Sequence, residues 1–447
     1  MSPTTIIMSE WERRGPDEDV RLLGYSFGDD ETVRLRARRL TESGRVEFRE
    51  LRDGLFIRSN SYVGNVQLGN LRLVIQPKIS GAPLLNLLRY AYNLRNLDLH
   101  GPATQAIGDS TFLDLLIHQL LVETQELIAR GLHRNYERTE NVLTSPRGRI
   151  DFQRYALNGG TAKAALPCIY HPRLQNTLVN RVLLSGLQLA ARLTGDLILR
   201  ARLRRLAALL ADDVLPLRLE RQVMGRVWRE IDRRTAAYRP SLILIQMLIQ
   251  MAGVRLDESP EQVRLPGFLF DMNRFFQAFL SRFLHENLLG HKVQDEYRLR
   301  DMMVYAEGFN PRGLESPTPR PDFVVSTRGS IVAILDAKYI DLWHHGPPAS
   351  ILYQLTVYAL SQGLGSSTTI LYPTMDASAS ESRLDIRHPL NQRIQAQIIL
   401  RPVHLGQLEQ LISHSVSHRN RQHRLGVAKY MIFGEPTGAT SPIQIPQ

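Results

Sequence analysis

The first 80 residues alternate apolar and polar positions in short runs, as the strands of a half-buried sheet do. Four segments show this pattern: TVRLRARRL (32–40), RVEFREL (45–51), GLFIRS (54–59) and LRLVIQPKI (71–79). Gly, Asn and Ser residues separate the runs, and GNVQLGN (64–70) supplies two turn signals. We therefore predict a β-rich N-terminal domain over residues 1–82, built as a small antiparallel sheet or barrel.

From residue 83 the period of the apolar positions becomes helical. The segments are PLLNLLRYAYNL (83–94), STFLDLLIHQLLVETQELIARGL (110–132), QNTLVNRVLLSGLQLAARL (175–193) and LILRARLRRLAALLADDV (197–214). Gly131 should end the second helix. SLILIQMLIQMAGV (241–254) is too short to span a bilayer and contains two glutamines, so we expect a buried helix. These patterns predict a mainly helical domain over residues 83–256.

A third pattern follows DESPEQVRLPG (257–267), which has the composition of a linker. It runs as a helix over 270–289, a strand with a turn over 292–308, a hairpin over 321–340, a helix over 350–364 and a strand over 368–373. This order predicts an α/β domain around a mixed central sheet over residues 265–447, and an α+β multidomain fold for the chain. The basic HRNRQHR (418–424) is best explained as a solvated terminus.

Charge adds a candidate partner. The chain holds 55 Lys+Arg against 44 Asp+Glu, which gives a net charge of +11. Such a balance attracts a polyanion such as DNA, although arginines spread over solvated faces explain it equally well. The single cysteine, Cys168, excludes an intramolecular disulfide and a cysteine-built zinc site. With no apolar stretch of signal-peptide length at the start, we expect a cytoplasmic protein without membrane association.

The candidate chemistry lies in the hairpin RPDFVVSTRGSIVAILDAKYI (320–340). Only five of the basic residues are lysines, so Lys338 stands out in a chain that otherwise uses arginine. Asp336 and Lys338 are two apart on a strand and point to the same face. Apolar neighbours on both faces indicate an interior strand, where a carboxylate and an ammonium are costly without partners.

The hairpin also returns Asp322 to the same edge of the sheet. Two carboxylates beside a lysine are what metal-assisted phosphodiester hydrolysis requires, because acids hold Mg²⁺ and an amine can act at the phosphate or the attacking water. A structural salt bridge between Asp336 and Lys338 is the competing interpretation. The Pro-Asp that opens one strand, together with D-x-K at the end of the next, favours the nuclease site.

Gln354 and Tyr358, in SILYQLTVYAL, lie four apart and share one face of the following helix. They could contact the lysine, metal-bound waters or a DNA phosphate. On the helix pattern alone the simpler interpretation is favoured, in which Tyr358 packs in the core with Leu352 and Leu355, and Gln354 is solvated.

These motifs resemble the PD-(D/E)xK nuclease pattern, with the Q-x-x-x-Y helix of its RecB-like branch. More closely, ILDAKYI (334–340), LYQLTVYA (352–359) and ILYP (370–373) resemble, in that order, the McrC family. McrC is the nuclease subunit of restriction systems that act on 5-methylcytosine-type modifications. The resemblance continues upstream in LLRYAYNL (87–94), PRGRIDF (146–152), QNTLVNRVL (175–183) and FDMNRFFQAFL (270–280), so it covers the chain from about residue 83 to the end.

The resemblance implies a metal-dependent endodeoxyribonuclease with catalytic Asp322, Asp336 and Lys338. One or two Mg²⁺ ions, for which Mn²⁺ can substitute, would be held by Asp322, Asp336 and the carbonyl of Ala337. Gln354 and Tyr358 would support the site. The first nuclease helix often carries a glutamate where this chain has Gln277, and Glu286 and Glu296 are weak substitutes for it.

The resemblance also implies a partner, a McrB-like AAA+ GTPase ring that reads the modified base and whose hydrolysis McrC stimulates. Consistent with this, the sequence contains no G-x-x-x-x-G-K-[ST] nucleotide-binding motif. The helical middle domain would then dock the partner. Its arginine-rich segment GLHRNYERTENVLTSPRGR (131–149) could bind the partner or DNA, or be an ordinary solvated surface.

Two other functions compete with a DNA endonuclease subunit of a modification-dependent, antiviral restriction system. In the first, the nuclease fold survives only as a non-catalytic adaptor that binds DNA or the motor. In the second, the chain is an unrelated α/β enzyme in which Asp336 and Lys338 are structural. The presence of all three core residues favours the endonuclease.

Overall fold

The computed structural model describes residues 4–28, 30–79, 81–94, 112–157, 165–252, 267–363, 365–413 and 418–434. The chain forms two compact units. The first consists of Met1–Leu94 and Arg255–Gln447, and the second of Arg95–Val254. The N-terminal β-region and the C-terminal domain thus belong to the same unit. The division into three domains stays a prediction, and most of the expected linker lies outside the described residues.

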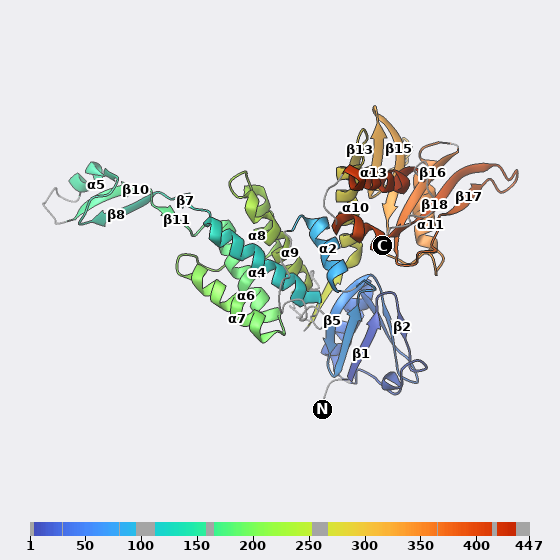
Figure 1. The fold of residues 1–447 in the computed structure, drawn as a ribbon, viewed down its shortest axis with the longest axis horizontal. Helices are drawn as coiled ribbons and strands as arrows, with labels where there is room; N and C mark the ends of the chain where they lie inside the picture. The colour runs from blue at the N-terminus through green and yellow to red at the C-terminus, as the bar shows by residue number, and fades with distance from the viewer. Residues whose placement is uncertain are drawn as a thin grey trace. The chain divides into compact units, whose positions relative to one another are not determined.

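A four-stranded sheet joins the two sequence segments of the first unit. Its strand order is β1 (Thr4–Ser9), β6 (Leu71–Gln76), β5 (Tyr62–Leu68) and β12 (Gly267–Asp271). β12 pairs antiparallel with β5 although the two strands lie about 200 residues apart in the sequence. A second sheet holds β2 (Arg13–Arg14), β4 (Leu55–Ser59) and β3 (Val46–Glu50) in that order (Figure 1). The predicted β-rich start is therefore present. β1, β2 and β12 are additions to it, and β5 is a strand where GNVQLGN was expected to turn.

One predicted strand is wrong. Residues 32–40 belong to helix α1 (Glu31–Glu42), which follows the short 3-10 turn Val20–Leu22. The side chain of Asp30 caps α1 by accepting hydrogen bonds from the backbone N–H groups of Thr32 and Val33. The buried residues are Val33, Ala37 and Leu40. Their spacing is that of one helix face, and it overrides the local alternation on which the strand prediction relied.

The second unit is mainly helical, as expected. Its helices are α4 (Phe112–Arg130), α6 (Leu178–Leu193), α7 (Leu197–Ala211), α8 (Arg221–Glu230) and α9 (Arg239–Ala252), with a 3-10 turn at Ala236–Tyr238. Gly131 follows α4 with a φ of 91°, a conformation that favours glycine. Leu244, Ile245 and Leu248 of α9 are fully buried, which confirms a buried helix. Within the described residues, no helix has the length and apolarity needed to cross a membrane.

The second unit also carries an antiparallel arm that the sequence analysis missed. We call β7 to β11 the β-arm. It consists of β7 (Asn135–Tyr136) paired with β11 (Arg173–Leu174), the sheet β8 (Thr139–Leu143), β10 (Leu166–Tyr170) and β9 (Arg149–Ile150), and helix α5 (Phe152–Leu157). In Figure 1 it extends away from the helices of its own unit. Its strands are short and largely exposed, so they lack the apolar alternation by which strands are recognised.

The C-terminal domain contains the predicted mixed sheet. The six strands lie in the order β13 (Lys292–Asp295), β14 (Phe323–Thr327), β15 (Ser330–Ala337), β16 (Ser366–Thr374), β18 (Ile394–His404) and β17 (Ser382–Arg387). β15, β16 and β18 are parallel and the other pairs antiparallel. Its helices are α10 (Met272–Asn287), α11 (Ala349–Leu360), α12 (Leu405–Ser413) and α13 (His418–Phe433), and α2 (Gly81–Tyr92), which was expected in the helical middle domain, packs against α10 and α12 in the first unit. β15 lies inside the sheet, as its apolar neighbours predicted.

The basic segment 418–424 is solvated only in part, which corrects that prediction: Arg419, Arg421 and His423 are exposed. It forms the first turns of α13, where Asn420 and Arg424 are buried. The Arg424 guanidinium donates to the backbone carbonyls of Leu411 and Ile412 at the end of α12. A cation in that place satisfies carbonyls that the helix leaves unpaired.

The packing of α6 against α9 makes a testable prediction about stability. A Cβ atom on Gly186 would lie 2.4 Å from Cδ1 and 2.5 Å from Cγ1 of the buried Ile245. We expect Gly186→Ala to lower the melting temperature, because overpacking costs about 1–3 kcal/mol and outweighs the gain in helix propensity. Gly225→Ala in α8 is the control, since its Cβ would meet nothing within 4 Å. It should stabilise the protein, and equal effects of both variants in a thermal melt would contradict this account.

Candidate active site

The β14–β15 hairpin brings together the residues that the sequence singled out. Arg328 and Gly329 form its turn with φ values of 51° and 87°, the left-handed pair that suits a two-residue hairpin. Phe323 lies opposite Leu335, so the next positions outward are Asp322 and Asp336. β15 ends at Ala337, and the Lys338 N–H continues toward β16 by donating to the Leu371 carbonyl at 3.0 Å. Both acids and the lysine therefore lie at one edge of the sheet.

One ammonium group lies between two carboxylates. Nζ of Lys338 is 2.8 Å from Oδ2 of Asp336 and 3.9 Å from Oδ2 of Asp322. Oδ2 of Asp322 also accepts a hydrogen bond of 2.8 Å from the Ala337 backbone N–H. The ion pair between Asp336 and Lys338 fits the structural interpretation as well, but the second carboxylate beside it exceeds what one lysine can neutralise.

Burial sets the electrostatics of this cluster. Asp336 is fully buried, while the side chains of Asp322 and Lys338 are 19% and 29% exposed. Burial, followed by the charge of Asp336, raises the pKa of Asp322 to about 6. Burial likewise raises the pKa of Asp336. For Lys338, burial lowers the pKa, but the two carboxylates outweigh it and the net shift is upward.

The donor set fits a magnesium ion. Oδ1 of Asp336 is buried and accepts no hydrogen bond within the described part of the chain, while Oδ2 faces the Lys338 ammonium. With Lys338 the two acids carry one surplus negative charge, which is costly in a buried place without a cation. Among the described residues, no three His, Cys, Asp or Glu side chains gather as a metal centre. Mg²⁺ needs only one or two carboxylates because it keeps several waters, so this pair and the Ala337 carbonyl suit it.

Helix α10 contributes the amide of Gln277 at the position where the resemblance leads one to expect a glutamate. Nε2 of Gln277 donates to Oδ1 of Asp322 at 3.0 Å, which fixes the orientation of that carboxylate. Glu286 instead accepts from Tyr90 and Arg282, and Glu296 pairs with Arg320. The sequence marked position 277 as unusual but did not assign this contact to it.

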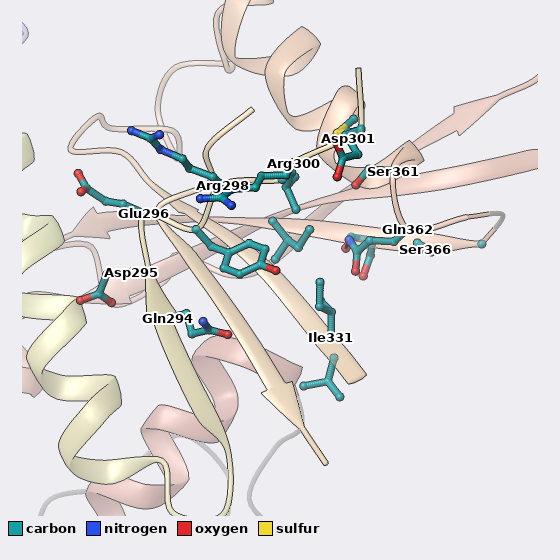
Figure 2. Close-up of a pocket in the computed structure, with 17 residues that line it drawn as sticks. Gln294, Asp295, Glu296, Arg298, Arg300, Asp301, Ile331, Ser361, Gln362 and Ser366 are labelled. Carbon is teal, nitrogen blue, oxygen red and sulfur yellow. Dashed lines mark hydrogen bonds between the residues drawn. The ribbon is translucent and has the colours of Figure 1, made fainter. Parts of the chain in front are cut away.

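A groove of about 1320 Å³ lies on the same sheet but does not contain the three residues. It is lined by residues 294–302 at and after the end of β13, by Ile331, Val332 and Ile334 of β15, and by Ser361, Gln362, Gly365, Ser366 and Ser367 between α11 and β16. Figure 2 shows the charged side chains of Glu296, Arg298 and Arg300 along it. The groove adjoins the acidic cluster, because the backbone N–H of Glu296 in its lining donates to the Asp322 carbonyl at 2.8 Å and, besides burial, the charge of Glu296 helps to raise the pKa of Asp322.

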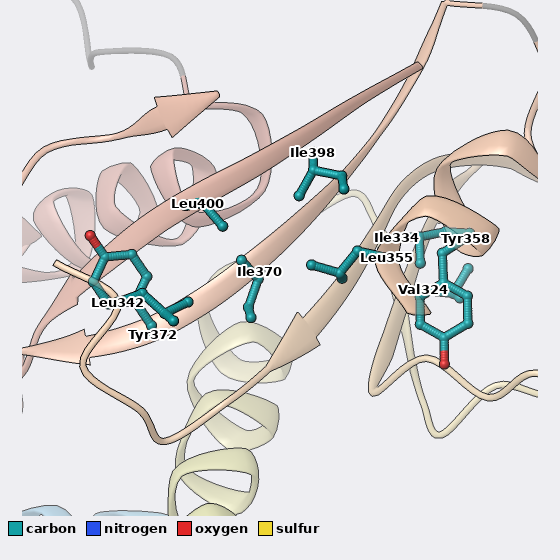
Figure 3. Packing of buried hydrophobic residues seen from close by; sticks show 9 residues of the cluster. All are labelled: Val324, Ile334, Leu342, Leu355, Tyr358, Ile370, Tyr372, Ile398 and Leu400. Carbon is teal, nitrogen blue, oxygen red and sulfur yellow. The ribbon is translucent and has the colours of Figure 1, made fainter. Parts of the chain in front are cut away.

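Gln354 and Tyr358 of α11 fit both interpretations made from the sequence, a contact with the site and packing in the core. Nε2 of Gln354 donates to the hydroxyl of Tyr358 at 2.9 Å. Tyr358 is 3% exposed and packs in the core cluster with Leu355, Val324 and Ile334 (Figure 3). Burial raises its pKa, and the hydroxyl is near enough for the charges of Asp336 and Lys338 to act on it. Gln354 is half-buried, so the expectation that it is solvated is wrong.

The comparisons with known proteins agree with this architecture. The model of the McrBC 5-methylcytosine restriction system component family matches residues 57–373. Because the match spans more than half of the chain, the chain belongs to this family. It starts upstream of residue 83, where the sequence resemblance was expected to begin, and ends at residue 373 rather than at the end of the chain, so residues 1–56 and 374–447 lie outside it. No curated protein matches the sequence.

Two solved structures are similar to the chain. One is a chain of the refined half-complex from the tetradecameric assembly of Thermococcus gammatolerans McrB AAA+ hexamers with bound McrC. Its TM-score is 0.59 at 19% identity, covering 94% of this chain and 98% of that chain. The other is the cryo-EM structure of the Thermococcus gammatolerans McrBC complex, with a TM-score of 0.44 at 20% identity over 64% of this chain and 88% of that one. The first likeness shows a shared mixed α+β fold.

The raised pKa of Asp322 predicts a pH dependence of stability in metal-free buffer. A folded-state pKa of about 6, above the ordinary 3.8, means that the ionised carboxylate destabilises the fold at neutral pH. Relative to Asp322→Asn, the wild type should therefore gain on the order of 1–2 kcal/mol as pH falls from 7.5 to 5. Chemical denaturation in EDTA measures this difference.

An exposed acid of the same sheet provides the control for this experiment. The pKa of Asp385 on β17 lies below its ordinary value, because Gln397 and Arg387 stabilise its charged form. Asp385→Asn should then leave the difference from wild type flat between pH 5 and 7.5. Profiles of wild type and Asp322→Asn that run parallel over this window would refute the raised pKa of Asp322.

Proposed function

We propose that this chain is the Mg²⁺-dependent endodeoxyribonuclease subunit of an McrBC-like, modification-dependent restriction system. It acts with an AAA+ GTPase ring and stimulates that ring. The observation that carries the proposal is the pair of buried carboxylates sharing one lysine at the end of an interior strand. Membership of the McrBC component family supplies the biological context.

In this proposal the residues divide the work by position. Asp322, Asp336 and the Ala337 carbonyl hold one or two Mg²⁺ ions, for which Mn²⁺ can substitute. A metal held there would supply Lewis-acid polarisation of the scissile phosphate and activation of a water. Lys338, 2.8 Å from Asp336, is placed to stabilise charge on the phosphate or to orient that water. Gln277 orients Asp322, and Gln354 with Tyr358 supports the lysine side of the site.

The partner is proposed from what the chain lacks and what it resembles. The sequence has no nucleotide-binding G-x-x-x-x-G-K-[ST] motif, so hydrolysis in the system requires another subunit. The similar solved structure contains McrB AAA+ hexamers with bound McrC. The β-arm offers exposed aromatic side chains, Tyr136 and Phe152, next to the arginines of segment 131–149. Aromatic residues and arginine are the types enriched at protein interfaces, so we assign the partner contact to this part of the chain.

The site assignment predicts that Asp336→Ala and Lys338→Ala abolish DNA cleavage. Each removes a group that acts on the metal or on the phosphate, and we expect losses of at least about 10³-fold. Cleavage of modified DNA by the chain with its GTPase partner and Mg²⁺ measures the effect. Assembly with the partner and stimulation of its GTPase should remain. Asp385→Ala, which removes an exposed acid from the same sheet, should cut normally, and unchanged cleavage by either site variant would refute the assignment.

Metal binding can be measured without cleavage. Mg²⁺ should raise the melting temperature of the wild type, because it binds the folded state and offsets the surplus negative charge. Asp336→Asn should lose this shift, whereas Asp385→Asn should keep it. If the wild type shows no Mg²⁺-dependent shift and cuts no DNA with its partner, yet still assembles, the chain is a non-catalytic adaptor.

A further inference from the structure

Glu10 is a buried carboxylate far from the acidic cluster in sequence. It follows β1 and is 1% exposed. Its Oε1 accepts hydrogen bonds from the Tyr339 hydroxyl at 2.8 Å and from the Lys78 backbone N–H at 2.9 Å. Its Oε2 is buried and accepts no hydrogen bond from the residues that the structure describes. Burying a carboxylate costs free energy, so the reason that Glu10 lies there is to be found in its hydrogen bonds.

The main contact of Glu10 is the residue that directly follows Lys338. Tyr339 is 3% exposed, and besides its hydroxyl it is held at two further points. Its backbone N–H donates to Oδ1 of Asn273 on α10 at 2.8 Å, and its ring meets that of Phe276 edge-on, with centroids 6.0 Å apart. Tyr339 is thus fixed by backbone, ring and hydroxyl together.

A second route connects the N-terminal sheet to the same tyrosine. Nδ2 of Asn273 donates to the hydroxyl of Ser61 at 2.6 Å, and the Met272 N–H donates to the Ser61 carbonyl at 2.9 Å. Ser61 directly precedes β5, so the N-terminal region reaches Tyr339 once through Glu10 and once through Ser61 and Asn273. Both routes belong to the first unit.

We propose that Glu10 and Asn273 are positioning residues that set the Lys338 side chain by fixing Tyr339. Lys338 needs such support because it lies just beyond the end of a strand. β15 ends at Ala337. Beyond it the Lys338 backbone is held by its N–H on the Leu371 carbonyl, by its own carbonyl, which accepts from the Ile340 N–H at 3.0 Å, and by the anchored Tyr339 between Lys338 and Ile340. The inference rests on the proposed nuclease function. It gives the β-region a role in catalysis, although Glu10 lies outside the residues that match the family.

The experiment compares variants that remove the hydrogen bond between Glu10 and Tyr339; Glu10→Ala also removes the acceptor of the Lys78 N–H. Tyr339→Phe and Glu10→Ala break the contact between Glu10 and the tyrosine hydroxyl, whereas Glu10→Gln keeps an acceptor oxygen. Tyr90→Phe is the matched control: its hydroxyl donates to Glu286 at 2.6 Å in the same unit, without touching Lys338 or its neighbours. Each protein is assembled with the GTPase partner. Single-turnover DNA cleavage is then followed over a Mg²⁺ titration, together with the melting temperature.

A positioning role makes the rate and the metal dependence respond differently. Tyr339→Phe and Glu10→Ala should lower the saturating cleavage rate at least about tenfold, because small misplacements of a catalytic group are costly. Their Mg²⁺ half-saturation should not change, since both metal-binding acids stay in place. Glu10→Gln should restore the rate to within about twofold of wild type, and Tyr90→Phe should cut at the wild-type rate even where it melts earlier.

The outcomes separate this inference from the function on which it rests. If the wild type cuts and Tyr339→Phe cuts equally fast, the positioning role is overturned while the nuclease stands. The same holds if every variant, Tyr90→Phe included, loses rate in proportion to its loss of melting temperature. A wild-type assembly that does not cut overturns the proposed function and the positioning role with it.

Discussion

Two buried carboxylates that share one ammonium are the constraint around which the C-terminal domain is arranged. The surplus negative charge favours unfolding, so the surroundings must hold the two acids together against their repulsion. The register of β14 and β15 sets their spacing, and the Ala337 N–H and Gln277 fix Asp322 by hydrogen bonds. The apolar cluster between α11 and the sheet keeps the strand ends rigid (Figure 3). A site that binds a cation well is for this reason a weak point of the metal-free fold.

The elements that the sequence predicted correctly are those whose signals are local. The β14–β15 hairpin has its own turn residues, and the helices α4, α6, α7 and α9 have long apolar faces. Residues 32–40 were misread because Val33, Leu35 and Ala37 alternate over a short window. The cap Asp30 and the buried position of Leu40 show the helical period only over a longer window. The β-arm was missed because its strands are exposed, and β12 because its partner β5 is distant in sequence.

The same distinction between local and distant signals decides which residues of the candidate site could be predicted. Asp322, Asp336 and Lys338 lie within one hairpin, so alternation along two strands was enough to bring them together. The contacts from Gln277 and Glu10 come from packing between segments that are far apart in the sequence. No spacing rule relates position 10 to position 339, and a single buried glutamate has no pattern of its own. Such partners of a catalytic group become visible only in three dimensions.

The pairing of β12 with β5 bears on how the chain folds as it is synthesised. Until residue 271 has left the ribosome, the N-terminal sheet lacks its fourth strand, and β5 presents an open edge able to pair with other chains. The whole second unit is translated in between. Closing this sheet is therefore a late, long-range step, of the kind that is slow and exposes folding intermediates to aggregation. Chaperone protection during this interval should matter more for the yield of native protein than the stability of the finished fold.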